Sequence, residues 1–230
     1  MLMKNKVKKI GTHTWIFPLN SVKDRPNLGY VLGEKMALAI DAGHSSSHVE
    51  DFYQALEKEG LPLPDFTVIT HWHWDHTFGM HAVHGRTLAR PETNRQLEEI
   101  RDRIEQDASY GKKFLQSDPC IRREYAGGVP LAVVPAMEEV TKDMTLDLGG
   151  VTARICYGQS PHTDDSLLIY VPEDRVLFIG DAQLGEFPSW RMDFDKLAAL
   201  REQIRGFDAR VVIDGHWTPY TKEEILAELV

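Results

Sequence analysis

The sequence predicts an α/β (α+β) protein in which two β-sheets pack together and helices cover their outer faces. Short apolar, β-branched runs occur in two groups, and helical segments follow each group. The order is not a regular alternation of strands and helices, which argues against a Rossmann fold or a TIM barrel. No repeat or linker divides the 230 residues, so we expect a single domain over residues 1–230.

The first group of strands occupies the N-terminal third of the chain. Its members are short runs rich in β-branched and apolar residues, at residues 7–17, 28–32, 36–40 and 66–70. The second and third runs flank Gly33-Glu34-Lys35, which is the pattern of a β-hairpin. Between the last two runs, serines 45–47 offer N-caps and apolar residues recur at helical spacing until Gly60, so a helix is expected there.

Residues 91–117 are strongly helical and heavily charged, and this segment is the least core-like part of the chain. One face of the expected helix is spaced to point inward, and it contains Leu97, Ile100, Arg101 and Ile104. We therefore expect a helical insertion at about residues 91–118, lying over one edge of the domain.

The second group of strands follows the insertion. Its expected members are residues 131–135, 144–148, 151–157, 167–171, 176–180 and 210–214. Asp193 is placed to cap a helix that runs to about Arg205. Thr221-Lys222-Glu223-Glu224 is a capping box that begins the last helix.

Composition limits the classes of partner. The net charge is −9, which disfavours nucleic acids and anionic membranes because phosphate binding needs concentrated Lys and Arg. The chain has two cysteines, Cys120 and Cys156, too few to suggest a disulfide framework. It shows neither a secretory signal nor a run of the ~20 apolar residues that a membrane span needs. We expect a cytoplasmic protein with a small-molecule substrate and no membrane partner, and its oligomeric state stays open.

Four potential metal ligands fall within six residues, in His71-Trp72-His73-Trp74-Asp75-His76. They directly follow the expected strand at residues 66–70, and ligands at the end of a rigid strand are held in place before a metal arrives. Three further candidates stand beside other apolar runs: His162, Asp181 and His216. Five histidines and two aspartates are about the supply that two metals with open positions need.

In this order, the hexapeptide, His162, Gly180-Asp181 and Gly215-His216 resemble the metallo-β-lactamase-fold hydrolase superfamily over residues 41–216. The resemblance implies a four-layered αββα sandwich with two mixed β-sheets and the metals at one edge of the sheets. It also implies a role for each ligand. The first metal would be held by His71, His73 and His162, the second by Asp75, His76 and His216, and Asp181 would bridge the two.

The implied cofactors are two divalent metal ions. Neutral imidazoles suit zinc, whereas the carboxylates would also suit iron or manganese. Two such ions give a charge of +4, and Asp75, Asp181 and a bridging hydroxide give −3. The remaining positive charge would lower the pKa of bound water from 15.7 toward ~7 and stabilise an oxyanion. Asp75 is the expected catalytic residue, which would orient the nucleophile or accept its proton.

The resemblance therefore implies a hydrolase that acts on a small ester, thioester, lactone or phosphodiester. The fold hosts several chemistries, so two alternatives stay open. One is an iron-dependent oxidoreductase, similar to persulfide dioxygenases, that uses chiefly the first metal. The other is a non-catalytic metal-binding domain.

A few further residues carry weaker expectations. By alternation, Trp72 and Trp74 should face away from the metals and pack in the core. Asp41 should either accept a hydrogen bond from a ligand or only end a strand. Trp217 should line or narrow the pocket beside the second metal. Structural roles are expected for the remaining histidines, which are His13, His44, His48, His81 and His84.

Two segments are expected to select the substrate. One is the insertion, taken as residues 91–128. The other is the loop at residues 183–191, which follows Asp181 and carries Phe187, Trp190 and Arg191.

Overall fold

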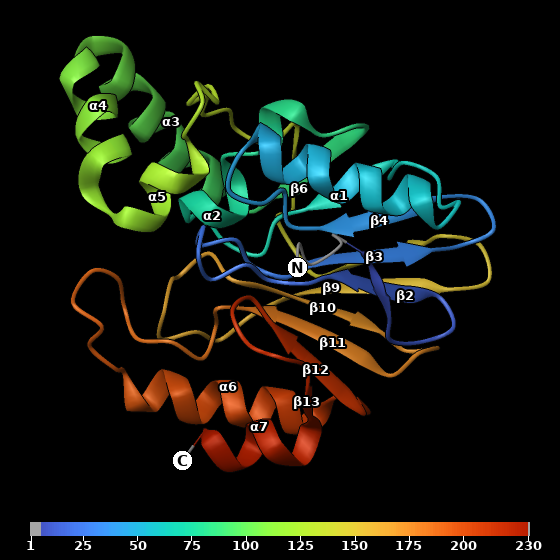
Figure 1. Cartoon of the computed structure of the whole chain (residues 1–230). Helices are drawn as coiled ribbons and strands as arrows, with labels where there is room; N and C mark the ends of the chain where they lie inside the picture. Colours follow the sequence, from blue (N-terminus) through green and yellow to red (C-terminus); the bar gives the residue numbers. More distant parts are fainter. Residues whose placement is uncertain (1–5, 230) are drawn as a thin grey trace.

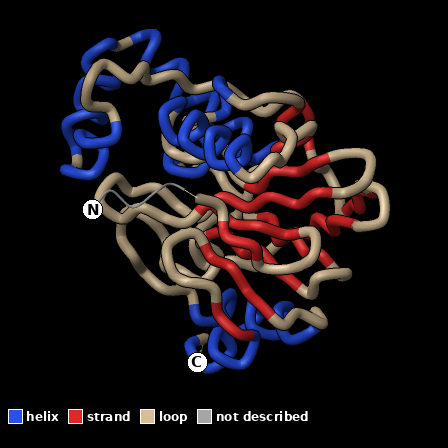
Figure 2. Tube along the Cα trace, turned by 45° about the vertical axis from the view of Figure 1, so that its right-hand side comes forward, coloured by secondary structure: helices blue, strands red, loops and turns tan. Residues whose placement is uncertain are grey.

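Two β-sheets pack face to face, and helices cover both outer faces, in a computed structural model that describes residues 6–229 (Figure 1). The first sheet has the strand order β1-β2-β3-β4-β5-β6-β7, and the second has the order β13-β12-β11-β10-β9-β8. Both sheets are mixed, since parallel pairs occur at β4–β5–β6–β7 and at β11–β12. Figure 2 shows the strands enclosed between helices on either side. The predicted αββα sandwich is confirmed.

The first sheet is formed by residues before and beside the insertion. Its strands are β1 (Lys8–Lys9), β2 (Thr14–Phe17), β3 (Leu28–Leu32), β4 (Ala37–Ile40), β5 (Phe66–Val68), β6 (Arg86–Ala89) and β7 (Glu138–Glu139). Strands β3 and β4 pair antiparallel, which confirms the predicted hairpin. Strands β6 and β7 were not predicted, because runs of four and two residues are too short to show a clear alternation.

The second sheet is formed by the C-terminal half. Its strands are β8 (Met144–Asp147), β9 (Thr152–Tyr157), β10 (Leu167–Val171), β11 (Val176–Gly180), β12 (Val211–Asp214) and β13 (Tyr220–Thr221). The predicted strand at residues 131–135 is wrong, because this segment has no regular structure. Its side chains Leu131, Val133 and Val134 pack in the same apolar cluster as Leu97 of the insertion. These residues are therefore apolar because they pack against a helix. An apolar run by itself does not show whether a segment forms a strand or packs as an irregular segment.

The helices cover the sheets as the capping residues predict. Helix α1 (Ser46–Lys58) lies on the outer face of the first sheet, with Ser45 as its N-cap. Helices α6 (Phe194–Gly206) and α7 (Lys222–Glu228) cover the second sheet, and begin at Asp193 and at the predicted capping box of Thr221. Among the described residues, every helix is too short or too polar to cross a bilayer.

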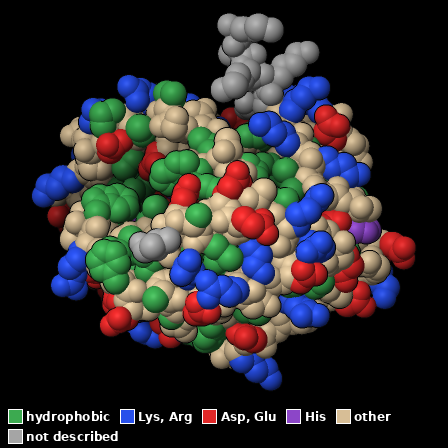
Figure 3. Space-filling model, turned by 90° about the horizontal axis from the view of Figure 1, so that it is seen from below, with side chains coloured by type: hydrophobic (Ala, Val, Ile, Leu, Met, Phe, Trp, Pro, Cys, Tyr) green, Lys and Arg blue, Asp and Glu red, His purple; other side chains and the backbone are tan. Residues whose placement is uncertain are grey.

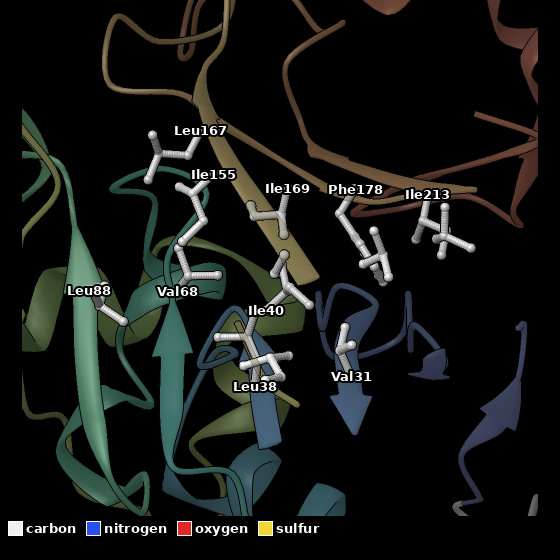
Figure 4. Close-up of a cluster of buried hydrophobic side chains, with 14 of the residues drawn as sticks. Val31, Leu38, Ile40, Val68, Leu88, Ile155, Leu167, Ile169, Phe178 and Ile213 are labelled. Carbon is white, nitrogen blue, oxygen red and sulfur yellow. The ribbon is translucent and has the colours of Figure 1, made fainter. Parts of the chain in front are cut away.

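The largest apolar layer lies between the two sheets. Leu38 and Ile40 of β4 face Ile169 of β10 and Phe178 of β11 across it, and all four are buried (Figure 4). Complete burial of such a side chain contributes about 1.5–3 kcal/mol. This layer holds the ends of the two sheets at a common edge.

The insertion projects beyond that edge and is formed by α3 (Pro91–Gln106), α4 (Ala108–Ser117) and α5 (Pro119–Glu124), drawn in green in Figure 1. It extends six residues past its predicted end at about 118. Leu97 is fully buried, and Ile100 and Ile104 are partly buried beside it, as their spacing predicts.

A buried ion pair fastens the end of the insertion to the sandwich. Glu124 accepts a hydrogen bond from Nε of Arg25 at 2.7 Å and another from the hydroxyl of Ser45, the N-cap of α1. Arg25 also donates to Asp51 at 2.7 Å. Burial raises the pKa of Glu124, but Arg25 and Ser45 outweigh it and hold that pKa below its ordinary value of 4.5.

We predict that Glu124→Gln destabilises the protein by about 3 kcal/mol at pH 7, because Arg25 loses a buried charged partner. A carboxylate with a depressed pKa stabilises the folded state above its unfolded pKa, and this contribution is lost as pH falls through the folded pKa. The difference between wild type and variant should therefore shrink below pH 4.5. Urea unfolding across pH measures it, with the exposed Glu57→Gln as control. Equal unfolding free energies at pH 7 would contradict the prediction.

Candidate metal centre

All seven predicted ligands meet at the common edge of the two sheets. His71 and His73 follow β5, and Asp75 and His76 lie in the short helix α2 (Trp74–Thr77). The other three come from the second sheet: His162 before β10, Asp181 directly after β11 and His216 after β12. They form two groups, and within each group the candidate ligand atoms lie within 4.8 Å of one another. The first group contains the three residues implied for the first metal, and the second contains the three implied for the second metal together with Asp181.

The first group contains His71, His73 and His162, all buried. Nδ1 of His73 lies 2.9 Å from Nε2 of His162. Nδ1 of His162 lies 2.7 Å from the carbonyl oxygen of Gly185, so Nε2 is the nitrogen that faces the group. Nε2 of His71 is buried and has no hydrogen-bond partner. Three imidazole nitrogens thus share one small volume.

The second group contains Asp75, His76, Asp181 and His216. Nε2 of His216 lies 3.0 Å from Asp75 Oδ2 and 3.2 Å from Asp181 Oδ2. Nε2 of His76 lies 3.4 Å from Asp181 Oδ1. Asp181 Oδ2 is also 3.9 Å from Nε2 of His162 in the first group. Asp181 therefore lies between the two groups, where a bridging ligand would have to be.

The buried polar atoms of the centre fit a metal. Nε2 of His71, Nε2 of His76 and Oδ1 of Asp181 are buried without a hydrogen-bond partner. Each such atom costs about 1–3 kcal/mol, and native proteins contain few of them. Cations that accept imidazole and carboxylate ligands would satisfy all three.

Charge differs between the two groups. Burial lowers the pKa of His73 to about 3 and that of His71 well below its ordinary value, so both imidazoles are neutral, as metal ligands must be. In the second group burial also lowers the pKa of His216, but Asp181 and Asp75 outweigh it and raise it to about 12. The two carboxylates thus require positive charge beside them, which a divalent ion would supply.

Asp41 holds one of the ligands in place. It is buried at the end of β4, and its Oδ2 lies 2.8 Å from Nδ1 of His76. Its Oδ1 accepts the backbone N–H of Thr70 at 2.7 Å. Of the two expected roles for Asp41, the contact with a ligand is therefore present. A hydrogen bond from Nδ1 leaves Nε2 of His76 facing the centre.

Thr70 joins the two sheets beside the ligands. Its carbonyl oxygen accepts the backbone N–H of Leu167 in β10 at 2.8 Å. Gly180, at the end of β11, lies so close that a Cβ atom there would come within 2.6 Å of the Thr70 hydroxyl oxygen. The residue before Asp181 must be glycine because of this close approach, and also because its φ is +53°.

The other five histidines lie outside both groups. Four of them place Nδ1 within 3.1 Å of a backbone carbonyl oxygen: His13, His44, His81 and His84. The fifth, His48, is buried and packs beside Phe17. These contacts agree with the structural roles expected for them.

A cavity of about 630 Å³ opens over the metal centre. Aromatic rings form much of its wall, and they are Trp74, Phe187, Trp190 and Trp217. Trp217 lies beside the second group, as predicted. Trp190 is 58% exposed and Trp217 49%, so both stand at its mouth. In the view from below, hydrophobic side chains are most numerous toward the left, and Lys, Arg, Asp and Glu side chains are spread over the whole face (Figure 3).

Two further cavities adjoin this one. A polar cavity of about 400 Å³ lies beside His73 and His162, and its lining includes Arg95, Arg191 and Lys196. An apolar cavity of about 310 Å³ lies under the insertion.

The prediction that Trp72 and Trp74 face away into the core is wrong for Trp72, which lines the polar and apolar cavities. It is only partly right for Trp74, which packs on the apolar cluster of the insertion but also lines the cavity over the metal centre. The strand ends at Val68 and helix α2 begins at Trp74, so the alternation of a strand does not continue through the hexapeptide.

Sequence reasoning missed Asp24. Its side chain lines the cavity over the metal centre, and its Oδ2 accepts a hydrogen bond from Nε1 of Trp74 at 3.3 Å. Asp24 lies in an irregular loop before β3, so only the fold brings it to the site.

Comparison with known proteins agrees with this geometry. The family model of the metallo-beta-lactamase superfamily matches residues 24–227. Two similar solved structures are the metallo-beta-lactamase from Pontibacter korlensis and that from Hirschia baltica. The first has 19% identity and a TM-score of 0.68, over 97% of this chain and 98% of that chain. The second has 18% identity and a TM-score of 0.66, over 97% and 95%.

At such identities the solved structures show a shared fold alone. The match to the family model shows more than a shared fold, because the matched residues include all seven candidate ligands and most of both sheets. The chain belongs to the metallo-beta-lactamase superfamily.

Proposed function

We propose that this protein is a dinuclear metal-dependent hydrolase that acts on a small ester, thioester, lactone or phosphodiester. The observation that carries the proposal is the pairing of two complete ligand groups, with Asp181 between them. Two adjacent divalent ions activate water and stabilise the charge that develops on a carbonyl or phosphoryl oxygen. The open cavity over both groups supplies a place for the substrate.

The seven residues of the centre would bind two metal ions. His71, His73 and His162 would hold one ion, and the four members of the second group would hold the other, with Asp181 shared. Zinc is the expected metal because five of the seven ligands are imidazoles, and iron or manganese are alternatives. Such ions would lower the pKa of bound water toward ~7 and so supply hydroxide at neutral pH.

Asp75 is the proposed catalytic residue. It is buried, lines the cavity over the metal centre, and lies at hydrogen-bond distance from His216. Histidines 76 and 216 outweigh burial and hold the pKa of Asp75 below its ordinary value, so the carboxylate stays ionised and can orient a water molecule or accept its proton.

The geometry favours the hydrolase over the two alternatives. An oxidoreductase that uses chiefly the first metal would not need the second group, yet the second group is equally compact and contains the buried, unpartnered His76 Nε2. A purely metal-binding domain would not need a cavity of about 630 Å³ that opens onto the ligands.

The first prediction concerns metal content. Purified zinc-loaded protein should contain two ions per chain and hydrolyse at least one member of a panel of chromogenic esters, thioesters, lactones and phosphodiesters. Asp181→Ala should lower activity more than about 100-fold and bind at most one ion, because it removes the shared ligand. Elemental analysis and initial rates measure both, with the exposed Asp102→Ala as control. One iron per chain, with oxygen uptake on a thiol persulfide, would instead indicate the oxidoreductase.

The second prediction concerns Asp41. Asp41→Asn keeps the size of the side chain but removes the negative charge beside Nδ1 of His76. Affinity for the second ion should fall about 10–100-fold, while the first ion binds as before. Competition with a chromophoric chelator measures each step.

The control for this variant is Asp65→Asn. Asp65 also accepts a backbone N–H of the first sheet, from Ala37 at 2.8 Å, but contacts no ligand. If both variants lose the same affinity, Asp41 acts through stability alone and the prediction fails.

A further inference from the structure

The apolar cavity under the insertion has the features of a binding site. Its volume of about 310 Å³ is at the lower end of the range for small-molecule pockets, ~300–1,000 Å³. Ile100 and Ile104 of α3 and Phe114 of α4 form one wall, and Trp74 and Phe187 form another. The charged residues among its lining, Glu99 and Arg103, are exposed and lie at its rim.

This cavity adjoins the cavity over the metal centre. Trp74, Ser117, Ile121 and Phe187 line both the apolar cavity and the cavity over the ligands. The ring of Phe187 lies 5.0 Å from that of Trp74 and 5.6 Å from the imidazole of His73, measured between centroids. Trp74 and Phe187 therefore form a boundary common to both cavities, so a molecule that reacts at the metals lies next to the apolar cavity.

The cavity is more than a packing defect. Apolar side chains that line an open cavity stay in contact with water, and removing their surface from water is favourable. Ile100, Ile104 and Phe114 pack against the apolar cluster around Leu97, but they stay partly exposed where they line this cavity. An apolar ligand would complete their burial.

We propose that this cavity binds an acyl, alkyl or aryl tail of the substrate while the bond to be cleaved lies at the metal centre. The inference rests on the proposed hydrolase function and narrows it to esters, thioesters or lactones that carry an apolar chain. The insertion and the loop at residues 183–191 would then select the substrate through the same cavity. The helices of the insertion and Phe187 of the loop both line it.

The test compares chain lengths. On 4-nitrophenyl acetate, butyrate, hexanoate and octanoate, kcat/KM of the zinc-loaded protein should rise up to about fourfold per buried methylene until the cavity is filled. Ser117→Trp places an indole at the boundary that the two cavities share and should abolish this dependence. Ile104→Phe, which fills the cavity from α3, should shorten the optimal chain. Gln116→Trp is the matched control, because Gln116 is the exposed neighbour of Ser117 and lines neither cavity.

A second readout needs no turnover. Titration calorimetry with 1-octanol should show binding to wild type and to Gln116→Trp, with an affinity about 16-fold lower for Ser117→Trp, the equivalent of two methylene contacts. Octanol binding without hydrolysis of any ester, thioester, lactone or phosphodiester in the panel would refute the hydrolase but support the cavity as an apolar binding site. Hydrolysis with no chain-length dependence and no octanol binding would overturn the inference and leave the hydrolase intact.

Discussion

The metal centre depends on the close contact of the two sheets around Thr70. The apolar layer between the sheets brings their ends together, and Thr70 then links β5 to β10 through a backbone hydrogen bond and to β11 through the close approach of Gly180. Because His71 follows Thr70 and Asp181 follows Gly180, this single junction sets the distance between ligands from different sheets. A side chain at Gly180 would separate the two halves of the site.

Preorganisation of the ligands follows from the same junction. The buried carboxylate of Asp41 contacts both Thr70, which joins the sheets, and His76, a member of the second group. The position of His76 is therefore tied to the junction of the sheets. His162 is oriented by a carbonyl oxygen of the loop at residues 183–191, and Phe187 of that loop also lines the cavity over the candidate metal centre and the cavity under the insertion. The loop thus connects ligand geometry with the shape of the pocket, which is how one fold can support different substrates.

The insertion adds a helical wall beside the candidate metal centre. Its end is fastened by the buried pair of Arg25 and Glu124, while its middle leaves an apolar space above Trp74. A rigid attachment at one end allows the helices to form a wall without filling the space beneath them. Helix α3 lies with one face toward water and the other toward the sandwich. Its outer surface is therefore charged and its inner stripe apolar.

Local patterns in the sequence were sufficient for much of the fold. The hairpin of β3 and β4, the N-caps Ser45 and Asp193, and the capping box at Thr221 depend on neighbouring residues, so they could be predicted directly. The grouping of the seven candidate ligands was also predictable, since their order and their places after strands match a known family. The strand predicted at residues 131–135 failed because an apolar run can pack on a helix as well as pair in a sheet.

What the sequence by itself determined was therefore the pair of sheets, the helix ends and the identity of the candidate ligands, all of which depend on local order or on a motif. Tertiary structure alone decided which residues surround those ligands. Asp24 and the cavity under the insertion arise from segments far apart in the chain, and the orientation of Trp72 depends on where β5 ends. Their positions follow from the packing of whole elements, and no short-range pattern of residues carries that information.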